Sequence, residues 1–566
     1  MNFENFMEEL FIDLKNNDKN CLKKLEENEN FIKKNLNSND LHNVIIKFIE
    51  NINNIISNNE NRFNLIEKFL KHSTVTNIFN LWKNSDVLLK ACKAGNKNAC
   101  KWLLDMDINS RVQDDEGKTA LMYAIENPSL LSIVKRLIVK NDCLNILDNN
   151  HNNALYYALH NTNALMELLH SEINVNNLNK DNETVLIYCC KNNIYEPIEF
   201  LTLNKNLNVN LTDNYNKTAA MYLAEKGRYK EIKSLNKQNC DYNYINKEGK
   251  SILSIVIDKI YKSNENLDIG ISNYFRIITS LVHMNANFCI PVDEDGNTAI
   301  MAFMLVNDFD TFCYVMKYSK CIDLSVKNNY GENACSLSLK LKTGSPYFHR
   351  LLKHNTFDFA YIDDNNNNTL LMLASMTIPK CIKEIIEYDI NKINNLNNKN
   401  ENALILATKC NLLESIKILI SNGININQQD SYGNTALYYA VDIGNLQIIT
   451  ILICNKADFN IKNNNGISAL DHAKELNDEN ILHAIFQQYS LPPLSDVDVK
   501  NELPIKYNEI LQYLNPLIKV DYSKVHMTKS LIGIEKSIYK TLKNDFDIHY
   551  DYESYSTKPA YYYTLH

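Results

Sequence analysis

Short apolar segments alternate with polar turns along most of this chain, and the segment around residue 435 shows the pattern clearly. Asp430 favours a turn, because its side chain can hydrogen-bond the backbone two residues further on. Gly433 allows the positive φ that such a turn needs, and the hydroxyl of Thr435 can accept a hydrogen bond from the first turn of a helix. The apolar residues that follow therefore predict a short helix, which Gly444 would end.

Residues that can cap a helix recur at a nearly constant spacing. Most neighbouring positions are about 33 residues apart, a spacing that indicates a stacked repeat architecture. Each position holds Thr, Ser, Asn or Asp, the residue types that cap helices best. We therefore predict that a helix starts directly after each of them. The predicted caps are Asp86, Thr119, Asn153, Thr184, Thr218, Ser251, Thr298, Asn333, Thr369, Asn402, Thr435 and Ser468.

Two further positions recur in phase with the caps. A turn-forming Asp or Asn stands five residues before each cap from the second repeat on. Two residues before the cap stands Gly, or a residue that tolerates the left-handed backbone region. The predicted turn residues are Asp114, Asp148, Asn179, Asp213, Asn246, Asp293, Asn328, Asp364, Asn397, Asp430 and Asn463. The predicted left-handed residues are Gly117, His151, Asn182, Asn216, Gly249, Gly296, Gly331, Asn367, Asn400, Gly433 and Gly466.

On these residues, the chain resembles the ankyrin-repeat proteins. The motif Thr435-Ala436-Leu437-Tyr438 stands where the family has Thr-Pro-Leu-His, so the copies are divergent. The resemblance extends over roughly 85–490 and implies an all-α solenoid of about twelve repeats, each with an inner and an outer helix. A small alanine on the inner helix lets neighbouring repeats approach closely. Val256, Phe303 and Ser338 replace it in the middle of the array.

The two ends and one interval depart from the repeat pattern. Residues 1–80 lack the markers but contain apolar residues at helical spacing, which predict two to four helices that cap the array. The interval from Ser251 to Thr298 is longer than the others, and we place the excess in a loop at 262–272, between the two helices of that repeat. Residues 491–566 are predicted to form a helical extension and a tyrosine-rich tail.

Composition argues against several functions. The net charge is −8 with both signs interspersed, which argues against a nucleic-acid binder. The 14 cysteines show neither a disulfide framework nor the paired spacing of a zinc site, and no apolar run reaches the length of a membrane helix. We find no catalytic constellation and expect no cofactor and no metal. The abundance of asparagine is attributed to an AT-rich genome.

The resemblance also implies where a partner would bind, because ankyrin repeats use their turn tips and inner-helix surface. Tyrosines just before the left-handed position offer a large contact area at low entropic cost. Acidic residues occupy other tips. The alternative for any single tip is an ordinary solvated surface. The candidate partner-binding residues are Tyr215, Tyr330, Tyr432, Glu116, Asp181, Glu248 and Asp295.

The predicted function is therefore a non-enzymatic scaffold of the cytoplasm, or alternatively the nucleus, that binds a partner protein on the concave face of its repeats. A second hypothesis comes from Leu503-Pro504, Glu509-Ile510-Leu511 and Tyr513-Leu514, which weakly resemble the start of an F-box. On that hypothesis the chain is a substrate adaptor that recruits a ubiquitin-ligase core. An amphipathic capping helix would explain the same residues.

Overall fold

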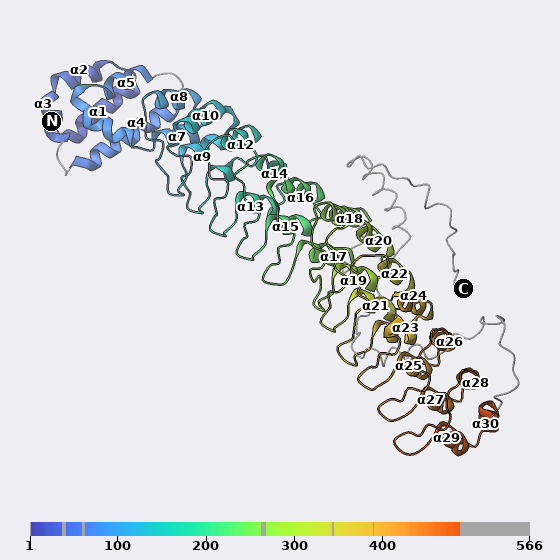
Figure 1. Ribbon diagram of the computed structural model, residues 1–566. Coiled ribbons are helices and arrows are strands. Elements are labelled where there is room, and N and C mark those ends of the chain that lie inside the picture. Colours follow the sequence, from blue (N-terminus) through green and yellow to red (C-terminus); the bar gives the residue numbers. More distant parts are fainter. Residues whose placement is uncertain are drawn as a thin grey trace, which may run out of the picture. The chain divides into compact units, whose positions relative to one another are not determined.

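A computed structural model shows that the predicted all-α fold is present (Figure 1). The chain divides into two compact units, Met1–Asp241 and Tyr242–His566. Isolated bridges such as that between Gln113 and Thr119 hold the bases of the turns. The structure describes residues 2–36, 41–58, 63–261, 268–341, 344–388 and 390–486.

Unit 1 contains helix pairs in phase with the predicted caps. Inner helices of successive repeats pack against one another, for example α7 against α9 and α13 against α15. The inner helices are α7 (Val87–Lys93), α9 (Ala120–Glu126), α11 (Ala154–Tyr157), α13 (Val185–Lys191) and α15 (Ala219–Glu225). The outer helices are α8 (Lys97–Asp105), α10 (Leu131–Lys140), α12 (Thr162–Leu169), α14 (Glu196–Leu201) and α16 (Tyr229–Leu235), with the 3-10 turns η3 (Pro128–Leu130) and η4 (Asn236–Gln238) beside them.

Unit 2 repeats this arrangement. The residues at the alanine position are fully buried, including the replacements Val256, Phe303 and Ser338. The inner helices are α17 (Ile252–Tyr261), α19 (Ala299–Leu305), α21 (Ala334–Lys340), α23 (Leu370–Thr377), α25 (Ala403–Lys409), α27 (Ala436–Ile443) and α29 (Ala469–Leu476). The outer helices are α18 (Asp268–His283), α20 (Phe309–Tyr318), α22 (Gly344–Leu351), α24 (Ile382–Tyr388), α26 (Leu413–Ser421), α28 (Leu446–Cys454) and α30 (Glu479–Phe486), with the 3-10 turns η5 (Pro379–Cys381) and η6 (Ile390–Lys392).

The predicted helix caps are confirmed from Thr119 onward. The Thr435 hydroxyl oxygen accepts from the Tyr438 N–H at 3.3 Å. The Asn402 side chain accepts from the Ile405 N–H at 3.0 Å. The other caps that make such a bond are Thr119, Asn153, Thr184, Thr218, Ser251, Thr298, Asn333, Thr369 and Ser468.

The left-handed positions are also confirmed. Gly433 has φ +77° and Asn400 has φ +55°, and even His151, an unusual choice for this region, has φ +60°. The same holds for every other residue predicted to occupy the region. The backbone conformation of the turn is therefore retained where glycine is not.

One predicted turn residue is wrong. Asp363, and not Asp364, accepts from the backbone N–H groups of Asn365 and Asn366, at 3.0 and 2.6 Å. This turn is one residue longer, since the Asp363 N–H reaches the carbonyl of Asn368, five residues on. Asp364 is thereby moved outward and forms an ion pair with Lys327 at 2.5 Å.

The first predicted cap is confirmed in position only. α7 begins at Val87, directly after Asp86, but the Asp86 side chain makes no capping bond. Its carboxylate instead accepts from the Asn53 side chain at 2.9 Å and pairs with Lys90 at 3.0 Å. No repeat turn precedes this helix, and α4 from the N-terminal region packs against it.

The N-terminal region contains more helices than the two to four expected. α4 packs on both α1 and α7, and Trp102 of the first outer helix stacks on Phe63 with ring centroids 4.9 Å apart. The region therefore contacts the first repeat directly. Its helices are α1 (Phe3–Lys15), α2 (Asn20–Glu27), α3 (Glu29–Leu36), α4 (His42–Asn58), α5 (Phe63–Leu70), η2 (Ser73–Val75) and α6 (Thr76–Lys83).

The long interval is only partly a loop. Residues 268–272, predicted as loop, belong to α18, whereas 262–267 lie outside the described residues. The extension at 491–566, with the segment that resembles an F-box, also lies outside them, so both hypotheses about it stay predictions. Of the helices in the described ranges, none combines the length and the apolar character needed to cross a membrane.

Candidate partner-binding surface

The turns of neighbouring repeats are joined through their backbones. The Asn149 N–H donates to the carbonyl of Glu116 at 2.9 Å, and the Lys180 N–H donates to that of Asn150 at 2.9 Å. In unit 2 the Asn464 N–H reaches the carbonyl of Tyr432 at 3.0 Å. The tips of successive repeats within a unit are therefore held side by side.

Tyrosine fastens some turns to their inner helix. The Tyr222 hydroxyl donates to the Asp213 carboxylate at 2.5 Å, and Asp213 also accepts from the backbone of its own turn. Burial first, and then the bond to Asp213, raise the pKa of Tyr222. The same arrangement joins Asp114 to Tyr123, Asp148 to Tyr157 and Asp430 to Tyr439.

At three of the turns whose turn residue is Asn, a glutamate and a lysine join the turn to the inner helix instead. The Asn397 amide donates to the Glu401 carboxylate at 2.8 Å, and Lys409 on the inner helix pairs with that carboxylate. An aspartate in the place of Asn397 would repel the glutamate. The choice of Asp or Asn is thus coupled to its neighbours. Equivalent triads are Asn179, Glu183 and Lys191, and Asn328, Glu332 and Lys340.

Asparagine side chains provide a second set of bonds between repeats. The Asn176 amide donates to the carbonyl of Asn206 at 2.7 Å, and its oxygen accepts from the Asn208 N–H at 2.8 Å. A single side chain thus pairs with two backbone groups of the next repeat. These asparagines therefore have a structural role, which an AT-rich genome alone does not explain. Asn145, Asn210 and Asn427 use both ends of their amides in the same way.

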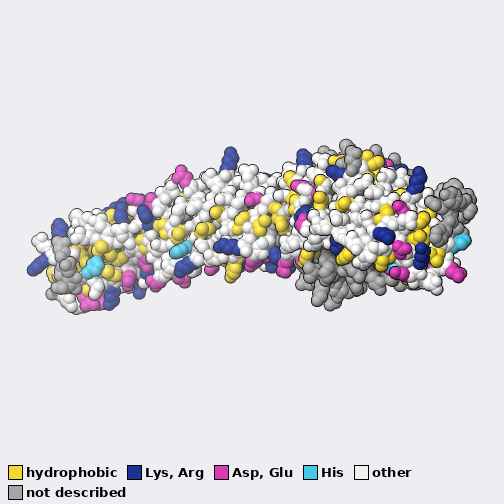
Figure 2. Space-filling view, turned by 60° about the horizontal axis from the view of Figure 1, so that its bottom comes forward, with side chains coloured by type: hydrophobic (Ala, Val, Ile, Leu, Met, Phe, Trp, Pro, Cys, Tyr) yellow, Lys and Arg dark blue, Asp and Glu magenta, His cyan; other side chains and the backbone are white. Residues whose placement is uncertain are grey.

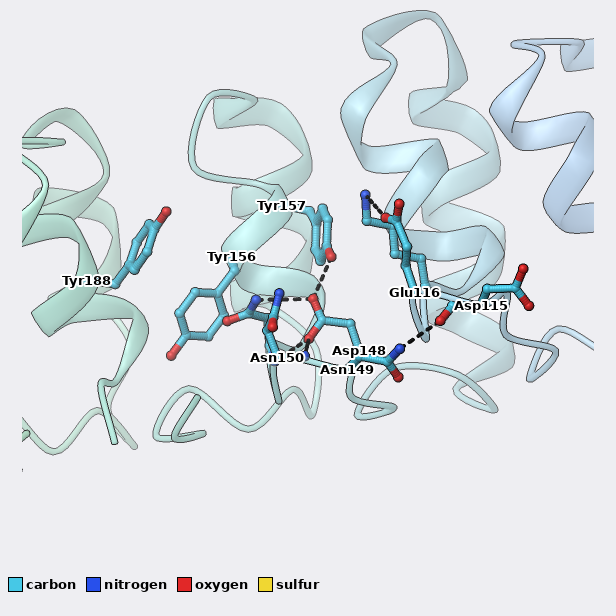
Figure 3. A pocket seen from close by; sticks show the side chains of 10 residues that line it. Asp115, Glu116, Asp148, Asn149, Asn150, Tyr156, Tyr157 and Tyr188 are labelled. Carbon is cyan, nitrogen blue, oxygen red and sulfur yellow. Dashed lines mark hydrogen bonds and ion pairs between the residues drawn. The ribbon is translucent and has the colours of Figure 1, made fainter. Parts of the chain in front are cut away.

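A hollow of about 410 Å³ opens between the turns of the second and third repeats in unit 1 (Figure 3). The turn residues Asp115 and Glu116 border one side of it. Tyr156 of α11 and Tyr188 of α13 border the other, in an edge-to-face contact with ring centroids 5.6 Å apart. In Figure 3 the Tyr157 hydroxyl points at Asp148, with which it forms a 2.6 Å hydrogen bond.

The hollow combines negative charge with aromatic surface. Glu116 is exposed and pairs with Lys118 at 2.9 Å. The carboxylate of Asp115 is exposed and has no ion pair among the described residues. Tyr156 is half-buried, and burial first and then the charge of Glu183 raise its pKa, so the phenol is neutral. Such a lining favours a cationic side chain over an anionic one.

The predicted tyrosine tips differ in their surroundings. Tyr432 is 66% exposed and Tyr215 is 64% exposed. Tyr330 is 38% exposed, and its hydroxyl donates to the carboxylate of Asp295 on the neighbouring turn at 2.8 Å. That bond raises the pKa of Tyr330. Two of the three rings are thus open to solvent, and the third is tied to an acidic tip.

The predicted acidic tips are likewise divided. Glu116 lies at the hollow and Asp295 holds Tyr330. Asp181 and Glu248 are exposed at their own turns. On the face shown in Figure 2, acidic and basic side chains are interspersed.

The hollow and the tyrosines of its wall were not among the sites predicted from the sequence. Tyr156 stands three residues after its cap and Tyr188 four residues after, on the helix surface that the resemblance already assigned to partner binding. Several inner helices carry tyrosine at these two positions, as the Tyr438-Tyr439 pair shows. Tyrosine four residues after the cap mostly bonds the turn aspartate. The usable signal for an interface was therefore tyrosine three residues after the cap, as at the half-buried Tyr156 and Tyr438.

The fold defined by these observations is a solenoid of helix pairs joined by hydrogen-bonded turns. Models of ankyrin repeats in three copies match residues 53–143, 127–213 and 341–430, and a model of ankyrin repeats in many copies matches 411–453. The chain is an ankyrin-repeat protein. The ankyrin repeat protein L92 of Acanthamoeba polyphaga mimivirus is 27% identical over 306 residues, which cover 50% of this chain and 69% of that protein. Val256, Phe303 and Ser338 lie between the matched ranges, whereas Cys189, which also replaces the alanine, lies within one of them.

Proposed function

We propose that this chain is a non-enzymatic scaffold that binds a partner protein through its turn tips and inner-helix surfaces. Ankyrin repeats are in general modules for protein–protein interaction, and the comparisons match ankyrin repeats without a catalytic domain. The observation that carries the proposal is the exposure of Tyr215 and Tyr432 at equivalent tips. A large ring on a turn fixed by hydrogen bonds adds little to the core and is already ordered for binding.

The acidic hollow supports a more specific form of this proposal. We infer that it receives an arginine or lysine side chain of the partner, which would lie between Asp115 and the Tyr156 ring. Attraction between opposite charges of this kind is screened by salt. Binding should therefore weaken as ionic strength rises.

The experiment starts from a partner recovered by pull-down with the full chain. Changing Tyr215 and Tyr432 together to Ser should weaken binding at least tenfold, about 1.4 kcal/mol. Stability should change by no more than about 0.5 kcal/mol for each exposed site. Val139→Ser is the matched control, because Val139 is 85% exposed on the outer helix α10. Full affinity in the double variant would show that the tips are only solvated surface.

The hollow is tested with Asp115→Asn, which removes a charge and keeps the shape. Affinity should fall, and the dependence of affinity on salt should become shallower. Glu8→Gln, on an exposed surface of α1, is the control for a general loss of negative charge. If both variants bind like the unchanged protein at low salt, the partner does not place a cation at Asp115.

A further inference from the structure

Three potential metal ligands meet on the outer helices of unit 2. His349 is on α22, Cys381 ends η5, and Glu384 is on α24, in the repeat that follows. One ligand atom from each of the three lies within 4.8 Å of the other two. Within the described residues, no other group of three or more His, Cys, Asp and Glu side chains brings its ligand atoms this close together.

An ordinary surface ion pair explains only part of this cluster. His349 Nδ1 and Glu384 Oε1 are 3.0 Å apart, and both side chains are partly exposed. The second carboxylate oxygen, Oε2, is shielded from solvent and has no hydrogen-bond partner among the described residues. A shielded carboxylate oxygen without a partner is uncommon and requires an explanation.

We propose that His349, Cys381 and Glu384 form a binding site for a zinc-type divalent metal ion. Thiolate, imidazole and carboxylate are the three ligand types that Zn²⁺ accepts, and a tetrahedral site has its ligand atoms about 3–4 Å apart. The observed cluster needs only a small contraction to reach that geometry. Three protein ligands leave the fourth position of the metal open to water or to a partner side chain.

Binding replaces the proton of the thiol by the metal. Burial, followed by the charge of Glu384, raises the pKa of Cys381 to about 12. The thiol is therefore protonated in the metal-free protein at neutral pH, and its proton leaves to solvent as the metal–sulfur bond forms. The cost of that step lowers the apparent affinity but does not alter the ligand set.

The ligands belong to two successive repeats, which explains why sequence spacing gave no metal signal. Cys381 and Glu384 are close in sequence, but His349 is about one repeat earlier and reaches them only because α22 packs against η5. A bound ion would therefore connect two outer helices. It should stabilise unit 2 in proportion to metal concentration, because it binds the folded chain in preference to the unfolded one.

The test is a titration of the full chain, freed of metal by a chelator, with Co²⁺ followed by Zn²⁺. We expect one equivalent of Co²⁺ to produce the absorption band of a thiolate–cobalt bond, and Zn²⁺ to abolish it. Cys381→Ala should remove the band. Cys335→Ala, which changes another fully buried cysteine of unit 2 outside the cluster, should retain it.

A second variant covers the case in which Cys381→Ala does not fold. Glu384→Gln keeps the shape of the side chain and should weaken Co²⁺ binding at least about tenfold, since even groups that only support a ligand contribute that much. The absence of a thiolate band in the unchanged protein, or a band that survives in Cys381→Ala, would overturn the proposal. Unchanged affinity in Glu384→Gln would do the same.

Discussion

The hydrogen bond between Tyr222 and Asp213 should make a large contribution to the stability of unit 1. Asp213 Oδ1 accepts from the backbone N–H groups of Tyr215 and Lys217, whereas Oδ2 accepts from the Tyr222 hydroxyl at 2.5 Å. Tyr222→Phe leaves the ring in place, with Lys217 Nζ still 5.2 Å from its centroid. The substitution therefore removes one bond and leaves one buried carboxylate oxygen without its donor.

The expected loss follows from that geometry. Both side chains are buried, with Tyr222 8% and Asp213 5% exposed. A hydrogen bond to a charged group contributes about 1.5–3 kcal/mol to stability. When only the donor is removed, the buried acceptor stays without a partner, and its desolvation penalty is not compensated. We expect Tyr222→Phe to lower the free energy of unfolding by that amount. A surface substitution changes it by at most about 0.5 kcal/mol.

Urea unfolding followed by circular dichroism measures this difference. Tyr215→Phe is the matched control, because it removes a hydroxyl from an exposed ring of the same turn. The double variant Asp213→Asn with Tyr222→Phe should lose less than the sum of the two single losses, because both remove the same bond. Equal stability of the Tyr222→Phe and Tyr215→Phe variants would refute the reasoning.

Three further predictions concern the turns. Thr435→Ala should cost about 1 kcal/mol through loss of the cap, whereas Thr435→Asn should be nearly neutral, and paired urea melts that show equal losses would exclude capping as the cause. Gly433→Ala should destabilise the protein more than Gly466→Ala, although both glycines have φ +77°. A Cβ at 433 would lie 2.7 Å from the Asn464 side-chain oxygen, whereas a Cβ at 466 would have no atom within 4 Å. Similar melting temperatures of the two variants would contradict this. Burial, with the bond to Asp213 next, raises the pKa of Tyr222 above its ordinary value, so the native state holds the phenol proton more tightly. That stability is present at neutral pH and is lost as pH rises above about 10, and Tyr222→Phe should reduce the loss in melts between neutral and high pH.

The sequence was sufficient for those parts of the fold that depend on local backbone requirements. A cap such as Thr435 and a left-handed residue such as Asn400 are determined by their own turn, so a single chain with many copies shows them plainly. Asp364 was assigned wrongly because a fixed register cannot reveal a turn that is one residue longer. Asp86 precedes its helix as predicted, but the loss of its capping bond could not be foreseen, because its partner Asn53 belongs to a region without repeats.

The candidate sites were harder to predict because they form between repeats. The Tyr215 and Tyr432 tips were predicted from position alone, and the structure shows them exposed. The hollow requires turns and inner helices from successive repeats to be placed together, and Tyr330 proved to be tied to Asp295 across such a boundary. The period and phase of the repeats predict which residues occupy equivalent positions, but not which residues of neighbouring repeats are in contact.

The asparagine bonds between repeats have a chemical consequence. Asparagine is among the residues most prone to slow breakdown, and deamidation of Asn176 would turn its amide into a carboxylate that can accept but not donate. The nitrogen now 2.7 Å from the carbonyl of Asn206 would become an oxygen, and the two would repel. Because each repeat is held only by its neighbours, one such event weakens one boundary and leaves the others intact. Deamidation would therefore weaken the coupling between neighbouring repeats at single boundaries before any repeat unfolds.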